Sequence, residues 1–241
     1  MILKFHKLYI NEQSRRLTRL ANIILFIEDL LEEVNGEGVY VFENDLYDPL
    51  VFDETTLNIK VKAKNTLGEE PPEELNISLE LVEHIDYDNM YILYDTAVKW
   101  FLDYAINELG KYITRTDRTG VEYYLAILEK GYVFLAEGEK HHIRLPLIKT
   151  FYMAHTHPTP YLMFSSRDID TVIDLFTYGG IVAAVMTGSG ILYIYRKGYF
   201  TDVDYYKLRE LRKYLTRGRV RVEEVNRILG LGNVRLHLRP F

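Results

Sequence analysis

Two histidines one residue apart, His155 and His157, are the residues of this chain whose types and spacing could do chemistry. Side chains of a β-strand alternate between its two faces, so both imidazoles would point the same way and could bind one metal ion. Pro158 follows directly and would end the strand, because proline cannot donate a ladder hydrogen bond. Asp168 comes ten residues later, at the expected start of a helix, where its carboxylate could be a third ligand.

Two imidazoles and one carboxylate are the ligand set of a catalytic zinc site. Structural zinc sites use four protein ligands, whereas catalytic sites use three and leave the fourth position open for water. The chain has no cysteine, so disulfides are excluded and zinc would have to be held by histidine and carboxylate side chains. The sequence therefore predicts a Zn²⁺ site made of His155, His157 and Asp168.

The run HTHPTPYLMFSSRD, residues 155–168, resembles the signature of the JAMM metalloproteases, also called MPN+ or JAB domains. These are zinc isopeptidases that remove ubiquitin or ubiquitin-like proteins from lysine side chains. The resemblance covers about residues 90–200 and implies an α+β domain of the cytidine-deaminase-like type, with a sheet flanked by helices. It also implies a hydrolase that cleaves isopeptide or peptide bonds at the C-terminus of a ubiquitin-like modifier, with metal-activated water and a glutamate general base.

The resemblance implies which glutamate that base is. The family places it upstream of the two histidines at the start of an early strand, and Glu122, which opens a predicted strand over 123–128, is our choice. A small residue often stands three positions after the family's glutamate, but a leucine stands there in this chain. Glu129 and Glu137 therefore stay open as alternatives.

Ser165 has two predicted roles. By resemblance it is the catalytic serine that stabilises the oxyanion developing on the attacked carbonyl. Its position three residues before Asp168 also matches a helix cap, for which Ser166 is the rival. Both roles can hold at once, because they use different groups of the residue.

Hydrophobic periodicity predicts the elements that must position these residues. Apolar residues at three- and four-residue steps indicate helices, and alternating apolar residues indicate strands. The strands over 57–63 and 75–81 look like a hairpin with a long loop. The predicted helices cover 14–34 (capped by Ser14), 95–110 (capped by Asp95), 168–178, 205–215 and 222–229. The other predicted strands cover 39–42, 90–93, 132–136, 143–147, 151–157, 181–186, 191–195 and 234–238.

Three segments follow from these patterns and from the charge. We expect an N-terminal α+β unit of unknown role over 1–85, the JAMM/MPN+-like catalytic domain over 86–200, and a basic helical C-terminal extension over 201–241. Residues 203–241 hold ten Lys and Arg against four Asp and Glu, a balance of +6, whereas the whole chain carries −6. The acidic remainder would repel nucleic acid, and a solvated helix face is the favoured interpretation of the basic extension.

Composition favours a globular protein that works outside the membrane. No apolar run approaches the roughly 18 residues that a membrane span needs. The N-terminus lacks the features of a signal peptide, so we expect a soluble, cytoplasmic protein. Two other functions stay open: a non-catalytic MPN-type assembly scaffold, and a nucleic-acid-associated protein that carries a JAMM-like hydrolase domain. The sequence leaves oligomerisation open.

Overall fold

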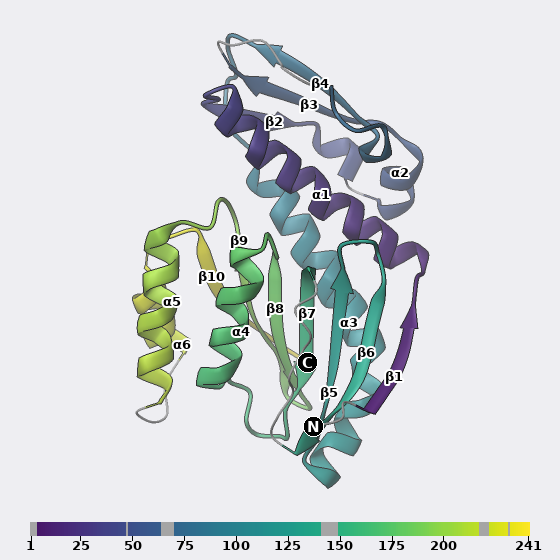
Figure 1. Ribbon diagram of the computed structural model, residues 1–241, viewed down its shortest axis with the longest axis vertical. Coiled ribbons are helices and arrows are strands. Elements are labelled where there is room, and N and C mark those ends of the chain that lie inside the picture. Colours follow the sequence, from purple (N-terminus) through teal and green to yellow (C-terminus); the bar gives the residue numbers. More distant parts are fainter. Residues whose placement is uncertain (1–3, 47, 64–69, 141–148, 217–221, 231) are drawn as a thin grey trace.

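The computed structural model describes residues 4–46, 48–63, 70–140, 149–216, 222–230 and 232–241 (Figure 1). Its helices are α1 Glu12–Glu33, α2 Pro49–Glu54, α3 Tyr91–Thr119, α4 Ser166–Thr177, α5 Asp202–Leu215 and α6 Val222–Leu229. Two short 3-10 helices are η1 Glu43–Leu46 and η2 Glu73–Leu75. The strands are β1 Lys4–Tyr9, β2 Gly38–Val41, β3 Leu57–Lys62, β4 Ile77–Val82, β5 Val121–Leu128, β6 Val133–Lys140, β7 Thr150–Thr156, β8 Val182–Thr187, β9 Gly190–Arg196 and β10 Val234–Pro240.

The architecture is α+β, as predicted, with helices on both faces of a large sheet. That sheet has seven strands in the order β1-β6-β5-β7-β8-β9-β10, and a separate three-stranded sheet has the order β2-β3-β4. Within the large sheet β7 and β8 are parallel, with α4 connecting them, and the other neighbours are antiparallel. The α4 connection therefore starts where β7 ends, directly after the predicted metal strand.

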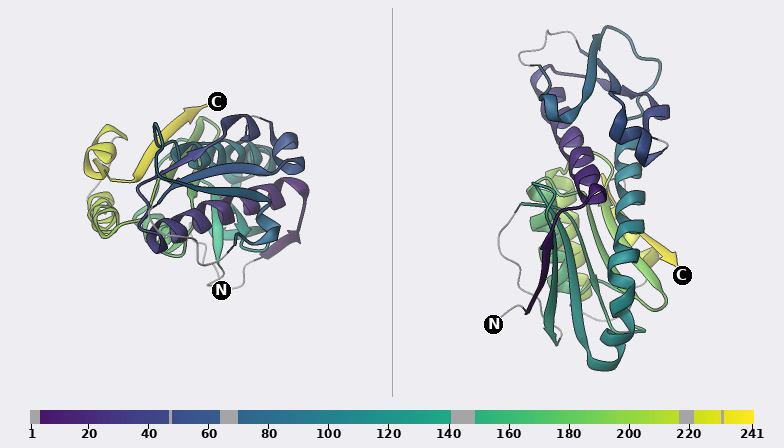
Figure 2. Two further views of the ribbon diagram at one scale, coloured as in Figure 1. Left: turned by 90° about the horizontal axis from the view of Figure 1, so that it is seen from above. Right: turned by 90° about the vertical axis from the view of Figure 1, so that its right-hand side faces the viewer.

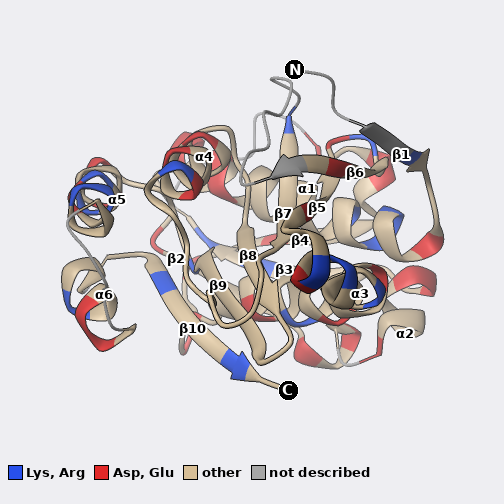
Figure 3. Cartoon of the chain, turned by 90° about the horizontal axis from the view of Figure 1, so that it is seen from below, with Lys and Arg blue, Asp and Glu red and all other residues tan. Residues whose placement is uncertain are grey.

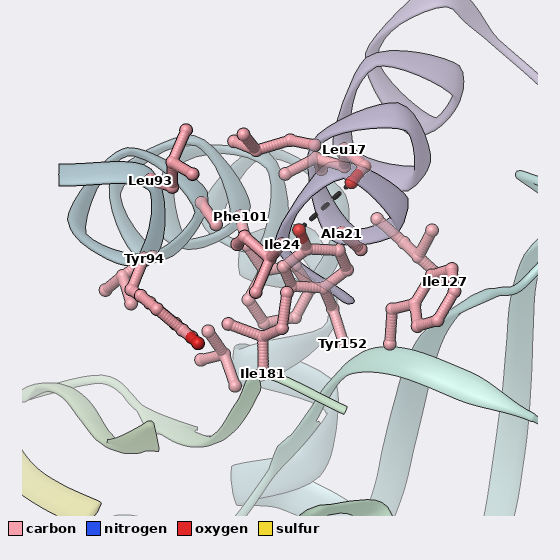
Figure 4. Close-up of a cluster of buried hydrophobic side chains, with 14 of the residues drawn as sticks. Leu17, Ala21, Ile24, Leu93, Tyr94, Phe101, Ile127, Tyr152 and Ile181 are labelled. Atoms are coloured by element: carbon pink, nitrogen blue, oxygen red, sulfur yellow. Dashed lines mark hydrogen bonds between the residues drawn. The ribbon is translucent and has the colours of Figure 1, made fainter. Parts of the chain in front are cut away.

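Two hydrophobic clusters lie on opposite faces of the large sheet. The cluster on one face contains residues of α1 and α3, and the cluster on the other contains residues of α4, α5 and α6. Helix α3 runs from the small sheet to the far end of the large sheet (Figures 1 and 2). In the first cluster Leu17 and Ile24 of α1 meet Tyr152 of β7, whose hydroxyl donates to the Leu17 carbonyl at 3.0 Å (Figure 4).

A buried ion pair ties α1 to the end of β9. The Arg196 Nη1 atom lies 2.8 Å from the Glu28 Oε1 atom, and both side chains are almost fully buried. Tyr94 of α3 donates its hydroxyl to the same Glu28 oxygen at 2.5 Å. The Nε of Arg196 also donates to the Gly180 carbonyl at 2.7 Å. Helix α1, helix α3, the end of β9 and the loop before β8 therefore meet at one charged contact.

Removing one partner of this pair is expected to destabilise the fold strongly. Arg196→Met leaves the Glu28 carboxylate buried without its cation, which should lower the free energy of unfolding by about 3–5 kcal/mol. Urea denaturation at neutral pH measures the change. The matched control is Arg239→Met, which removes an exposed pair with Asp103 (2.9 Å) and should cost below about 1 kcal/mol. Equal losses in the two variants would contradict the prediction.

The predicted strand over 90–93 is wrong, and so is the helix that was to begin at Asp95. Residues from Tyr91 onward belong to α3, which continues past Gly110 and ends at Gly120 with φ +68°. Leu93, Tyr94 and Ala97 are buried at helical spacing. As a helix, this segment places these apolar side chains on one buried face, whereas a strand would divide them between two faces. One glycine inside a helix costs only about 1 kcal/mol, which the packing of a 29-residue helix outweighs.

The predicted hairpin over 57–81 is also wrong, because β3 and β4 pair in parallel. Parallel strands need a connection of about a dozen or more residues, and residues 63–76 provide one. The first helix is capped by Asn11, directly before its first residue Glu12, and not by Ser14. Ser14 instead donates and accepts as the third helical residue of a capping box. The strand expected over 143–147 lies outside the described residues.

The segment boundaries at residues 85 and 200 stay predictions. Strand β1 of the N-terminal segment pairs with β6, and β10 of the C-terminal segment pairs with β9. The large sheet therefore takes one edge strand from each of the two outer segments. In the described part of the chain, no helix combines the length and apolar character that crossing a membrane requires.

Candidate metal centre

Strand alternation and a helix start bring His155, His157 and Asp168 together. His155 lies near the end of β7 and His157 directly after it, and their Nε2 atoms are 3.0 Å apart. Asp168 reaches them from the first turn of α4. Its Oδ1 lies 3.4 Å from the Nε2 of His155, and its Oδ2 lies 3.6 Å from the Nε2 of His157. The sequence does not predict these distances. Strand alternation and the position of the helix start nevertheless predicted the three residues correctly as neighbours.

The spacing of these donor atoms fits a metal ion. Each residue offers one ligand atom within 4.8 Å of the others, and both histidines are buried. Tetrahedral zinc with ligands at about 2.0–2.1 Å keeps its ligand atoms about 3.3–3.4 Å apart. The separation of the two Nε2 atoms, 3.0 Å, and the separation of His155 Nε2 from Asp168 Oδ1, 3.4 Å, lie close to that value. The group could therefore hold one metal ion after small side-chain adjustments.

The start of α4 fixes the position of Asp168. Ser165 is the N-cap residue, and its backbone N–H donates to Asp168 Oδ2 at 2.6 Å. The Asp168 backbone N–H donates in return to the Ser165 hydroxyl oxygen at 3.2 Å. This capping box leaves Asp168 Oδ1 directed toward His155. Ser165, rather than Ser166, is thus the cap, and its side chain is exposed beside the candidate site.

A backbone carbonyl selects the tautomer of His157. The Nδ1 of His157 lies 3.2 Å from the Tyr161 carbonyl oxygen, which can only accept a hydrogen bond. The network therefore assigns the proton to Nδ1 and leaves a lone pair on Nε2, facing His155 and Asp168. An outer partner of this kind orients a metal ligand. Sequence reasoning missed this contact, because the two prolines around Thr159 indicate a turn but not where its carbonyls point.

In the metal-free site the pKa values of the two histidines are shifted in opposite directions. Burial, followed by the neighbouring His155, lowers the pKa of His157 to about 4, so this imidazole is neutral. Burial opposes charge on His155 too, but the Asp168 carboxylate outweighs it and the pKa of His155 is raised. Burial likewise opposes charge on Asp168, but the two histidines and the Ser165 N–H outweigh it and hold its pKa well below the usual range.

Of the three candidate glutamates, only Glu122 lies at this centre. Its Oε1 is 3.8 Å from the Nε2 of His157, and it is buried on β5. Burial and, to a smaller extent, Asp168 raise its pKa to about 7, against an opposing effect of His155. Glu137 instead accepts from Tyr123 at 3.0 Å on the opposite face of the sheet. Glu129 pairs with Lys149 at 2.9 Å, at the other end of β5.

Comparisons with known proteins identify no relative. A scan against protein-family models found no match, and neither a search of curated proteins nor a search of solved structures found one. A function for this chain therefore has to be inferred from the chemistry of its own residues.

Proposed function

We propose that this protein is a zinc-dependent hydrolase of the JAMM type. It would cleave isopeptide or peptide bonds at the C-terminus of a ubiquitin-like protein modifier. The observation that carries the proposal is the convergence of His155, His157 and Asp168 with one buried glutamate, Glu122, beside them. Three nitrogen and oxygen ligands with an open position are the composition of catalytic rather than structural zinc sites.

The metal ion, Glu122 and Ser165 would have different roles in amide hydrolysis. Bound Zn²⁺ would supply Lewis acidity and lower the pKa of water toward about 7. Glu122 is placed to accept a proton at Oε1 and to pass it to the departing amine, and a pKa near 7 suits both steps. The Ser165 oxygen already accepts from Asp168, which leaves its O–H as a donor for the oxygen of the attacked carbonyl.

The fold proposal goes with the function. We propose that the large sheet with α3 and α4 forms a JAMM/MPN-like domain. Two features of the topology support this relationship. The glutamate strand β5 is antiparallel to the histidine strand β7, and the aspartate comes from the helix that follows β7. This order of glutamate strand, histidine strand and aspartate helix is the order that the family's motif implies.

The two alternative functions have less support. A non-catalytic scaffold of the MPN type would typically lack the metal ligands, whereas this chain brings them together. For nucleic acid, both signs of charge are mixed over α5 and α6 (Figure 3). Arg212 pairs with Asp170, and the Lys207 ammonium donates to the Leu229 carbonyl, so part of the basic extension is already engaged.

A metal-removal assay tests the proposal. The protein is stripped with a chelator, dialysed, and returned to Zn²⁺ before incubation with fusions of ubiquitin-like proteins to a C-terminal amide-linked reporter. We expect cleavage after the modifier's last residue with Zn²⁺ restored and none in the stripped protein. Stoichiometric zinc binding without cleavage of any fusion would overturn the substrate class. Absence of zinc binding would overturn the hydrolase and favour the scaffold.

A further inference from the structure

The last turns of α3 touch the metal strand from the face opposite to the histidine side chains. Thr116 of α3 and Thr156 of β7 are both fully buried, and their hydroxyl oxygens are 2.7 Å apart. The Thr156 oxygen also accepts from the backbone N–H of Tyr123 at 2.9 Å. Thr156 stands between the two histidines in sequence, and Tyr123 stands next to Glu122. This contact therefore holds the histidine strand against the glutamate strand.

The next residue of α3 holds the loop that follows the histidines. Asp117 accepts, through Oδ1, from the backbone N–H of Thr159 at 2.7 Å. The Thr159 hydroxyl in turn accepts from the Gly188 N–H at 3.1 Å, in the turn between β8 and β9. This loop contains Tyr161, whose carbonyl sets the tautomer of His157. Asp117 is thus connected to the Nδ1 side of the His157 ring through the backbone of residues 159–161.

We infer that Thr116 and Asp117 are positioning residues of the metal centre. Thr116 fixes the strand spacing at which Glu122 faces His157, and Asp117 fixes the loop whose carbonyl orients His157. Neither side chain approaches the metal ligands directly in the described structure, so both act through other residues. The inference rests on the proposed metal site and assigns to α3 a role in it that the sequence motif does not contain.

Geometry favours this role over simple structural support. A helix packed on a sheet needs only apolar contacts, which α3 makes along most of its length. Its final turns instead place two consecutive polar side chains on the segment 156–159. Outer hydrogen bonds that orient metal ligands typically change metal affinity about 10–100-fold when removed.

Metal affinity of the full chain tests the inference. Zn²⁺ dissociation constants are measured by competition with a chromophoric chelator, and the visible spectrum of the Co²⁺ form reports ligand geometry. We expect Asp117→Ala to weaken Zn²⁺ binding by about tenfold, the lower end of the range for outer partners, and to alter the Co²⁺ spectrum. Asp117→Asn keeps an acceptor oxygen and should restore both. The control Asp103→Ala removes a carboxylate of the same helix that pairs with the exposed Arg239 and should change neither.

The second test is Thr116→Val, which removes the hydroxyl that contacts Thr156. Thr116→Ser keeps a hydroxyl and should restore the parent's behaviour. Thr116→Val should also weaken Zn²⁺ binding and change the Co²⁺ spectrum, and it carries the test alone if Asp117→Ala does not fold. Thermal melts of the metal-free proteins separate the two roles, since purely structural support would lower melting temperature without changing the spectrum. Unaltered affinity and spectrum in both variants, with the parent binding zinc, would overturn the inference alone. A parent that binds no zinc would overturn the proposed function as well.

Discussion

Replacing His157 with alanine is expected to leave the protein without zinc after dialysis, whereas the parent retains about one ion per chain. Two ligands remain in the variant, His155 and Asp168, and their mutual ion pair competes with the metal. His157 is also the ligand that is neutral and correctly protonated before metal arrives, so its loss removes the ready-made donor. Mass-spectrometric metal analysis of untagged protein measures the result.

The substitution is chosen so that loss of zinc is not confused with loss of fold. His157 follows the last residue of β7 and does not belong to the hydrophobic cluster that contains Tyr152. Asp168→Ala would be a poorer test, because it also removes half of the capping box of α4. His84→Ala, at an exposed histidine, is the matched control and should retain zinc. Equal zinc content in His157→Ala and the parent would remove this centre as the metal site.

The three ligands could be predicted because each follows a local rule. Alternation along one strand places His155 and His157 on the same face, and the spacing from Ser165 to Asp168 is a capping box. These rules act within four residues of the chain and survive any error in the rest of the fold. The ligands could therefore be selected although the start of α3 and the pairing of β3 with β4 were predicted incorrectly and β1 was not predicted.

The general base could not be selected in the same way, because its position depends on register between strands. Tyr124 pairs with His155, and continuing that antiparallel register places Glu122 opposite His157. Glu137 pairs with Tyr123, the neighbour of Glu122, and therefore lies on the opposite face. A shift of one residue would exchange the faces, and nothing local in the sequence excludes that shift.

The sequence pattern also does not determine whether two strands pair in parallel or antiparallel, or which strands pair. Alternating apolar residues predicted β3 and β4 but are the same for parallel and antiparallel pairs. The beginning of α3 looked like a strand because Tyr91, Ile92 and Leu93 are large and apolar. The helix forms there because burial of Leu93 and Tyr94 against α1 and the large sheet outweighs local preference.

Glu122→Gln is expected to lower the rate of amide cleavage by about 10²–10⁴-fold while zinc content stays unchanged. Glutamine keeps the shape of the side chain but cannot accept the proton at Oε1, and Glu122 is not one of the three donors of the metal group. Initial rates on the ubiquitin-like fusion, together with metal analysis, measure both effects. Glu129→Gln, at an exposed glutamate paired with Lys149, is the control and should retain full activity.

Glu122→Gln should also change how the stability of the metal-free protein depends on pH. This effect distinguishes a buried glutamate with a raised pKa from an ordinary surface glutamate. Burial raises the Glu122 pKa from 4.5 to about 7, so between these pH values the folded state binds this proton more tightly than the unfolded state. The Glu122 contribution to the free energy of unfolding therefore falls as pH rises through this window and is constant above it. Glutamine does not titrate, so Glu122→Gln should gain stability relative to the parent between pH 5 and about 7, with the gain constant at higher pH. Urea denaturation of the chelator-treated proteins across this range measures the difference in free energy of unfolding between the variant and the parent. A difference that does not depend on pH would show that burial does not raise the pKa of Glu122, as a base with a pKa near 7 requires.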